Sequence, residues 1–414
     1  MAFKEGFSVR IKPFSDLRPP AKLAEEIASP PYDVVDTAEA RALAAGNPYS
    51  FLHVSRAEID LPDGIDLYSD SVYAKAADNF RRLQEKGGLI RDTRLGVFVY
   101  RLIREGREQR GVVTVCSVED YENDVIKKHE KTRKAPEDDR TRHIAATNAQ
   151  TGPVFLAYRD RPEIDGMIRD VEKGAPLYDF TAPDGVRHTI WSAQKPETLV
   201  QAFEKVPAAY IADGHHRAAA AARVAREHRA ANPAHTGREE YNWFLGVLFP
   251  AGQLRILPYN RCVRDLNGLS DEQFLAELKQ RFQFSEKAAP APTSPCHVSM
   301  FFRGCWQGLS WTPDPSADAA ARLDVSVLQD RLLNPVLGID DPRKNPRIEF
   351  VGGIRGTKEL ENRVTSGRAA VAFSMCPATV DQLMAISDAG QIMPPKSTWF
   401  EPKLRDGLLI HALD

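Results

Sequence analysis

The chain has 414 residues, of which 43% are hydrophobic and 27% are charged, and its formal net charge at pH 7 is −2. This composition is typical of a globular protein and lacks the basic excess of a general nucleic-acid-binding protein. No apolar run is long enough to span a bilayer, and the N-terminus does not resemble a signal peptide. The five cysteines are scattered and lack CxxC spacing, which indicates reduced thiols in a cytoplasmic protein.

Hydrophobic patterns and turn residues predict a mixture of strands and helices in chain order. Helices are expected at residues 19–27, 37–45, 68–87 and 137–148. An antiparallel pair is expected around the turn "REGREQ", and a buried strand at residues 50–54. Further strands are expected at residues 9–13, 153–158, 186–191, 208–211, 241–249 and 254–259.

A composition shift follows these strands. The segment "LNGLSDEQFLAELKQRF" predicts a helix with Ser270 as its N-cap, and "KAAPAPTSP" predicts a proline-rich loop. From about residue 266 strands and helices alternate again. The sequence therefore predicts an α/β (α+β) protein with two domains, residues 1–265 and a smaller domain at 266–414.

The stretch "YIADGHHRAAAAARVAREH" predicts a strand, a tight turn at Gly214 and an alanine-rich helix. His215, His216 and Arg217 then occupy the first helical turn, where positive charge opposes the helix dipole. Backbone N–H groups and these side chains together favour a phosphate site. Asp213 is a candidate Mg²⁺ ligand or proton acceptor. The alternative is an N-cap aspartate with solvated histidines. Zinc is less favoured because no third ligand has a familiar spacing.

A second stretch, "IKKHEKTRKAPEDDRTRHIAATNAQTGPVF", is dense in polar residues. It supplies His129 and Arg140 as candidate phosphate ligands and Asn148 as a candidate substrate ligand, before a glycine turn that leads into a buried strand. A solvated charged loop and helix explains the same pattern equally well.

A third stretch, "NPYSFLHVSRAEID", supplies Ser50, His53 and Arg56 as candidate substrate ligands and Glu58 as a candidate base. A buried structural role for His53 and an exposed-loop position for Glu58 are the alternatives.

A fourth stretch, "MPPKSTWFEPKL", places Lys396, Ser397 and Thr398 in one loop, a combination suited to phosphate, although it lacks the glycines of a Walker A motif. A terminal segment whose aromatic residues pack on the core is the alternative.

The words "PPYDVV", "NPYSFLHVSRAEID", "HEKTRKAPEDDRTRH", "TGPVFLAYR", "IADGHHRAAAA" and "MPPKSTWFEPKL" resemble a bacterial and archaeal family, domain-of-unknown-function family one-thousand-fifteen. They span nearly the whole chain. Members of this family tend to be associated with serine-biosynthesis genes. The resemblance therefore weakly favours the hydroxyl of an amino acid as the acceptor of a transferred group.

A more distant resemblance joins "VRIKPFSDLRPP" and "DGHHRAAAA" to the ParB/sulfiredoxin-like fold, whose free-serine kinases carry the same D-G-H-H-R word. It implies a ParB-like N-terminal core with large insertions. It also implies that His215, His216 and Arg217 hold phosphate while Asp213 acts near the metal or hydroxyl. The two words lie roughly two hundred residues apart here, farther than in the compact kinases, so Glu58 is assigned as base on residue type and position alone.

Together these features favour an enzyme that transfers a phosphoryl group from ATP, ADP or pyrophosphate to a small hydroxyl compound, with Mg²⁺ as cofactor and L-serine as the leading acceptor. The expected partners are a nucleotide and a small-molecule substrate, with no membrane or nucleic acid, and a homodimer is one expected assembly. The alternative is a ParB-like regulator that binds or hydrolyses a nucleotide without kinase activity. A third interpretation is an interaction protein without catalysis.

Overall fold

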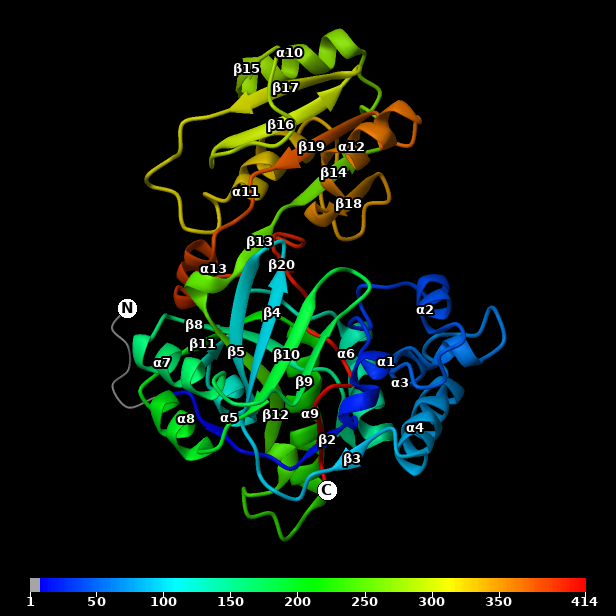
Figure 1. Ribbon diagram of the computed structural model, residues 1–414. Helices are drawn as coiled ribbons and strands as arrows, with labels where there is room; N and C mark the ends of the chain where they lie inside the picture. Colours follow the sequence, from blue (N-terminus) through cyan, green and yellow to red (C-terminus); the bar gives the residue numbers. More distant parts are fainter. Residues whose placement is uncertain (1–7) are drawn as a thin grey trace. The chain divides into compact units, whose positions relative to one another are not determined.

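The computed structural model describes residues 8–414, and they divide into two compact units (Figure 1). The first unit comprises Met1–Leu254 and Pro402–Asp414, and the second comprises Arg255–Glu401. The expected division at residue 265 differs from this one in two respects. The second unit begins earlier, and the end of the chain returns to the first unit, where Ile410 and His411 pair with Leu17 and Asp16. Composition along the chain does not reveal such a return, because it depends on pairing between distant strands.

The first unit is built on a nine-stranded sheet with the order β6-β11-β8-β12-β5-β4-β10-β9, in which β1 also pairs with β5. The pairs β11–β6 and β12–β8 are parallel, and the other pairs are antiparallel. The strands are β1 (Ile11–Lys12), β4 (Phe98–Arg104), β5 (Arg107–Ser117), β6 (Ile126–Lys127), β8 (Val154–Tyr158), β9 (Tyr178–Thr181), β10 (Arg187–Ser192), β11 (Ala209–Asp213) and β12 (Trp243–Pro250).

The predicted hairpin is confirmed as β4 and β5, which are joined by Glu105 and Gly106. Both residues have positive φ, 51° and 76°, as a two-residue type I′ turn requires.

Helices cover this sheet, and four of them gather at one side of the unit, where Figure 1 shows α1 to α4 in blue. The α-helices are α1 (Ala24–Ile27), α2 (Thr37–Ala44), α3 (Leu52–Ser55), α4 (Asp70–Glu85), α5 (Val118–Glu122), α6 (Lys134–Thr147), α7 (Pro162–Val171), α8 (Pro196–Phe203) and α9 (His215–Ala231). Short 3₁₀ turns are η1 (Ala21–Leu23), η2 (Ala57–Asp60), η3 (Glu240–Asn242) and η4 (Ala251–Gln253).

The strand predicted at residues 50–54 is wrong, because this segment forms α3 and leads into η2. Phe51 and Val54 are three residues apart and both enter the core that also contains Phe80 and Leu83 of α4. Spacing of this kind fits one face of a helix. A short apolar run does not distinguish a strand from a buried helical turn, which explains the error.

Helix α9 is central to the first unit. It contacts α5, α6, β8 and β12. Its buried alanines, including Ala218, Ala221 and Ala225, pack with Leu156 of β8 and Phe244 of β12. Small side chains on this face let the helix approach the sheet closely, which fixes the position of its first turn.

A small sheet with the order β3-β2-β21-β7 completes the first unit. Its strands are β2 (Asp16–Arg18), β3 (Ile90–Arg91), β7 (Ala149–Gln150) and β21 (Ile410–Ala412). Through β21 the C-terminal segment is held beside the end of α6, which precedes β7.

The second unit contains an antiparallel six-stranded sheet with the order β15-β17-β16-β19-β14-β18, and a separate pair, β13 with β20. The strands are β13 (Arg255–Leu257), β14 (Tyr259–Val263), β15 (Gln283–Ser285), β16 (His297–Phe302), β17 (Cys305–Ser310), β18 (Ile348–Gly352), β19 (Val371–Met375) and β20 (Trp399–Glu401). The helices are α10 (Asp271–Arg281), α11 (Asp324–Leu328), η5 (Gln329–Leu333), η6 (Gly353–Arg355), α12 (Gly356–Thr365) and α13 (Val380–Asp388).

The predicted N-cap of α10 is confirmed: the Ser270 side chain accepts a hydrogen bond from the backbone N–H of Gln273, within a capping box. The expected mixed α+β class is likewise confirmed. Within residues 8–414, none of the helices combines the length and the apolar character that crossing a membrane requires.

The alanine substitution of Leu156 should destabilise the first unit. Leu156 is fully buried in the core that holds α9 on the sheet, so truncation should lower the free energy of unfolding by about 2–5 kcal/mol. Urea denaturation measures this loss. The same substitution at Leu95, whose side chain is 61% exposed, should change stability little. Equal losses at the two positions would contradict the packing described above.

Candidate functional site

The candidate site lies where β11 passes into α9. Ile211 pairs with Leu156 and Asp213 pairs with Phe155, so Ala212 is an extra residue that forms a bulge. Gly214 follows with φ of 96°, a left-handed conformation that glycine adopts without strain. A Cβ added there would lie 3.0 Å from Nε of Arg217. The bulge and the glycine therefore direct Asp213 and Arg217 toward each other.

The first turn of α9 has neither an acidic residue nor a side-chain cap. Its backbone N–H groups thus face the strand end without a fixed anion, and such a helix start attracts negative charge. This agrees with the expectation drawn from the sequence.

Asp213 is held in an ion network. Its Oδ2 lies 3.2 Å from Nζ of Lys403 and 3.4 Å from Nη2 of Arg217. Burial opposes the ionisation of Asp213, but Lys403 and Arg217 outweigh it and hold its pKa below the ordinary value. Arg217 also donates to the backbone oxygen of Pro153, which ties α9 to the start of β8. Asp213 is therefore an anion at neutral pH.

The three histidines beside this network are neutral. Burial lowers the pKa of His215 and His216, and it lowers the pKa of His129 to about 4. The expectation of three cations at the start of the helix is therefore wrong, because only Arg217 keeps its charge there. Sequence composition cannot show the loss of solvent that neutralises an imidazole.

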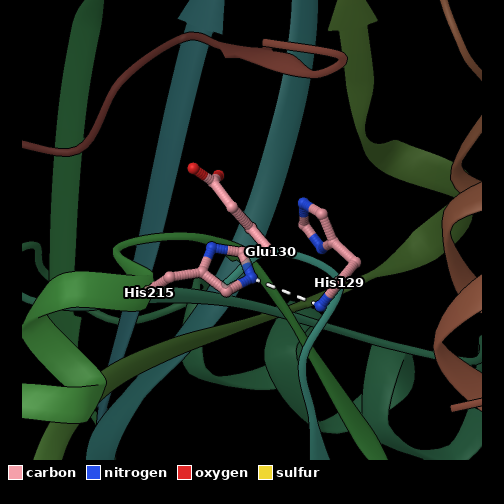
Figure 2. A group of neighbouring side chains, drawn as sticks. All are labelled: His129, Glu130 and His215. Carbon is pink, nitrogen blue, oxygen red and sulfur yellow. Dashed lines mark hydrogen bonds between the residues drawn. The ribbon is translucent and has the colours of Figure 1, made fainter. Parts of the chain in front are cut away.

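The histidines make different contacts. His215 and His129 pack edge to face with ring centroids 4.4 Å apart, and Nε2 of His215 accepts the backbone N–H of His129 at 3.5 Å (Figure 2). Nε2 of His216 accepts the backbone N–H of Arg133 at 3.1 Å. The pair His129 and His215 thus connects the second predicted stretch to the first.

One group of described side chains could hold a metal ion. Ligand atoms of His129, Glu130 and His215 lie within 4.8 Å of one another (Figure 2). Ligand atoms in a closed tetrahedral site are about 3.3 Å apart, so these side chains would have to move inward. Two imidazoles and a carboxylate suit zinc or manganese better than Mg²⁺, which prefers oxygen ligands. His129 and Glu130 would be the further ligands of such an ion, and sequence spacing did not reveal them because they come from a distant segment.

A second charged cluster also includes Arg217. Arg140 of α6 stacks on Tyr32 with its guanidinium carbon 3.8 Å from the ring centroid, and it pairs with Asp139 at 2.7 Å. Arg140, Arg217 and Asp406 line a cavity of about 30 Å³. Burial raises the pKa of Asp406 to about 7, although Arg217 and Arg140 act in the opposite direction.

The predicted base Glu58 lies in the helical part of the unit. It is 5% exposed, which excludes the exposed-loop alternative, and its Oε1 lies 2.8 Å from Nε of Arg56 and accepts the hydroxyl of Thr37 at 3.2 Å. Arg56 also donates to the backbone oxygen of Tyr32 at 3.4 Å. The contacts thus connect Glu58 to the Tyr32 loop, and its role as a base stays a prediction.

Two predicted substrate ligands, His53 and Ser50, have local structural partners, and a third, Asn148, ends a helix. His53 Nδ1 lies 2.9 Å from Asp60. Ser50 Oγ accepts the backbone N–H of Leu52 at 3.4 Å. Asn148 is exposed and ends α6 in a left-handed conformation with φ of 50°. Each of the three residues thus has a local structural role, and their roles as substrate ligands stay predictions.

The residues Lys396, Ser397 and Thr398 belong to the second unit. The ammonium of Lys396 lies 5.1 Å from the ring centroid of Tyr259, and Ser397 donates to the backbone oxygen of Pro394 at 2.6 Å. Their role in phosphate binding stays a prediction.

Sequence reasoning missed Lys403 and Asp406, which complete the two charged clusters around Arg217. A signal was present, since "PKLRD" is a charged word inside an otherwise apolar C-terminal segment. Tyr32 was likewise contained in "PPYDVV" without being assigned a role.

The asparagine substitution of Asp406 should change how stability depends on pH. The pKa of Asp406 is about 7 in the folded chain against an ordinary 3.8, so its contribution to stability is present below about pH 4 and is lost as pH rises toward 7. An asparagine amide at this position has no charge to bury. We expect Asp406→Asn to raise the melting temperature relative to wild type at pH 8 and to lose this advantage at pH 5. Parallel thermal melts at both pH values test this, and equal offsets would contradict the assignment.

Comparison with known proteins gives a family and weak structural likenesses. No curated protein matches the chain. SbnI with a C-terminal truncation, from Staphylococcus aureus, is 11% identical with a TM-score of 0.40, over 71% of this chain and 85% of that one. A free serine kinase in complex with AMP is 12% identical with a TM-score of 0.36, over 72% and 91%. A conserved hypothetical protein from Pyrococcus furiosus is 12% identical with a TM-score of 0.36, over 72% and 93%.

Because these TM-scores lie below 0.5, the structural likenesses identify no function. The family model described as "Protein of unknown function (DUF1015)" matches residues 11–326, which is most of the chain. The chain therefore belongs to the DUF1015 family, as the quoted sequence words indicate.

Proposed function

We propose that this protein is a phosphotransferase that moves a phosphoryl group from ATP, ADP or pyrophosphate to the hydroxyl of a small compound, with L-serine as the first acceptor to test. One observation carries the proposal. The uncapped start of α9 lies next to a partly buried network in which Arg217 and Lys403 both contact the carboxylate of Asp213. This arrangement places two cationic side chains close to the N–H groups that a phosphate would meet.

Phosphoryl transfer suits such a site, because the enzyme mainly has to position the phosphates and stabilise negative charge. The N–H groups of the first turn of α9 would donate hydrogen bonds to oxygens of one phosphate group. The ammonium group of Lys403 would contact a further oxygen of the same phosphate and offset its charge. Arg217 is held by Asp213 and Pro153, so its orientation is fixed before a ligand arrives. A fixed donor loses little side-chain entropy on binding.

The lowered pKa of Asp213 indicates its role. A carboxylate with a lowered pKa is a weak base. Because it remains ionised across the physiological pH range, it can orient a hydroxyl or ligate a metal ion. Asp213 would thus hold Mg²⁺ together with water and the phosphates, and the ion would offset charge on the transferred group. The loose transition state of phosphoryl transfer requires only weak base assistance.

The neutral histidines have a complementary role. A neutral imidazole both donates and accepts hydrogen bonds, so His215 and His129 can contact phosphate oxygens or the acceptor hydroxyl without adding charge. Their burial also excludes water, which would compete with the acceptor hydroxyl for the phosphoryl group. Glu58 remains the alternative base.

The asparagine substitution of Asp213 tests the proposal. Purified protein with Mg²⁺, ATP or ADP, and L-serine should form O-phosphoserine, measured by mass spectrometry and ³¹P NMR. Asp213→Asn keeps the size of the side chain but removes the charge, and it should lower kcat by at least about 100-fold. Circular dichroism and nucleotide binding should show that the variant is folded.

The matched control is Asp179→Asn, which removes an ion-paired aspartate of β9 that contacts Arg187 at 2.7 Å. This variant should retain activity. Absence of product with ATP, ADP and pyrophosphate across a panel of hydroxyl acceptors would overturn the proposal.

A further inference from the structure

Two parallel strands bring His129 and His215 together. β6 pairs with β11 in parallel, with Lys127 opposite Tyr210. Both strands therefore end at the same edge of the nine-stranded sheet, and each is followed two residues later by one of the histidines. The carboxyl ends of parallel strands are a common place for ligand sites in α/β proteins. Sequence spacing does not reveal this meeting, because 86 residues separate the two histidines.

Glu130 adds a carboxylate to the two imidazoles. Ligand atoms of His129, Glu130 and His215 all lie within 4.8 Å of one another (Figure 2). A point equidistant from three atoms at that separation lies about 2.8 Å from each, against roughly 2.0–2.2 Å in zinc sites. The ligand atoms thus have to move inward by less than about 1 Å. Glu130 is exposed, so a change of its rotamer supplies part of this movement without disturbing the core.

The hydrogen bonds of the two imidazoles suit metal binding. A ring N–H of His129 donates to the backbone oxygen of Ile211, which fixes the orientation of the ring. Ligating histidines typically donate one ring N–H in this way, and the other nitrogen of a neutral imidazole then carries the lone pair that binds an ion. Nε2 of His215 accepts the backbone N–H of His129 at 3.5 Å. A hydrogen bond of that length is weak, so little is lost when this nitrogen binds an ion instead.

The charges around the two histidines are of both signs. Asp213 acts on His129 and His215 in the direction that favours positive charge, whereas Arg217 acts on His215 in the opposite direction. The start of α9 also disfavours a cation, because its backbone N–H groups carry partial positive charge. Glu130 supplies a second negative charge, and as a direct ligand it acts at shorter range than these groups. The two carboxylates thus offset the start of the helix.

One side of the cluster faces solvent. His129 and His215 are 2% and 5% exposed, whereas Glu130 is exposed. An ion can therefore enter past Glu130 and be held against the buried imidazoles. Three protein ligands leave at least one coordination position for water or another oxygen ligand, as in catalytic zinc sites.

We propose that His129, Glu130 and His215 form a binding site for one divalent transition-metal ion, and that the site prefers Zn²⁺ to Mn²⁺ and Mg²⁺. Imidazole nitrogen favours Zn²⁺ over Mn²⁺, whereas Mg²⁺ prefers oxygen ligands. This ion is distinct from the Mg²⁺ proposed for Asp213. A role of the ion in binding a phosphate oxygen rests on the proposed function, but the metal site itself does not.

The experiment is isothermal titration calorimetry of the full chain, after a chelator has removed bound metal and without nucleotide. The probes are Zn²⁺, Mn²⁺ and Mg²⁺. We expect one Zn²⁺ to bind per chain, with weaker binding of Mn²⁺ and the weakest binding of Mg²⁺. Co²⁺ added to the metal-free chain should give the visible absorption bands of a coordinated ion, a signature that does not depend on activity.

Variants assign the ion to these ligands. Glu130→Gln removes the exposed carboxylate, and His129→Ala removes a buried imidazole. Each should weaken Zn²⁺ binding by at least about 100-fold, because changes beyond the ligands already cost about 10–100-fold. The metal-free Glu130→Gln chain should melt at the wild-type temperature, so that its loss of binding does not come from unfolding.

The matched controls are Glu227→Gln and His228→Ala. Both residues lie near the far end of α9, away from its first turn. Each control removes the same chemical group as one of the ligand variants. Both should bind Zn²⁺ as the wild type does.

The outcomes distinguish this inference from the proposed function. Zn²⁺ binding that both ligand variants lose, in a chain without phosphoryl transfer, would support the inference and overturn the proposed function. Phosphoryl transfer with Mg²⁺ by a chain that binds no Zn²⁺ would do the reverse. Equal Zn²⁺ affinity in wild type and Glu130→Gln, or tighter binding of Mg²⁺ than of Zn²⁺, would overturn the inference.

Discussion

The ion pair between Asp213 and Lys403 joins two segments that are almost two hundred residues apart in the chain, at 3.2 Å. Asp213 ends a strand in the main sheet, whereas Lys403 lies in the C-terminal segment that returns from the second unit. The bulge at Ala212 and the left-handed Gly214 direct Asp213 toward this partner. Without the returning segment, Asp213 would be a half-buried carboxylate whose desolvation only Arg217 offsets among the ion pairs described above. The charge state of Asp213 thus depends on the return of the C-terminal segment as much as on the motif at residues 213–217.

The alanine-rich sequence of α9 has a physical link to this site. Small residues such as Ala218 and Ala221 let the helix lie closely on β8 and β12, so that His215 and Arg217 of the first turn are buried and His216 is half-buried. That burial removes the charge from His215 and His216 and leaves Arg217 charged, because a guanidinium loses its proton far less readily than an imidazole. Close packing therefore converts a run of basic residues into one fixed cation and two neutral hydrogen-bonding groups.

Much of the fold could be predicted from local sequence patterns, and the exceptions have identifiable causes. The hairpin turn at Glu105 and Gly106 and the helix N-cap at Ser270 depend on interactions between residues that are close in sequence. Both could therefore be predicted from the sequence. Residues 50–54 were misassigned because their partners lie in α4, beyond any local window. In the candidate site, Asp213 and Arg217 were found from one motif. Lys403 and Asp406 were not, because their significance depends on a return of the chain that only strand pairing through β21 reveals.

Arg217 interacts electrostatically with two aspartates, Asp213 and Asp406, whose environments differ. Asp213 touches both Arg217 and Lys403, and these contacts outweigh burial and keep it ionised. Asp406 is near Arg217 and Arg140 but bonded to neither, and it also meets the negative charge of Asp33, so burial prevails and its pKa rises to about 7. Each aspartate has two cations nearby, so the opposite directions of their pKa shifts follow from whether those cations form ion pairs with the carboxylate. Asp213 is thus suited to a constant charge that orients a metal ion or a hydroxyl.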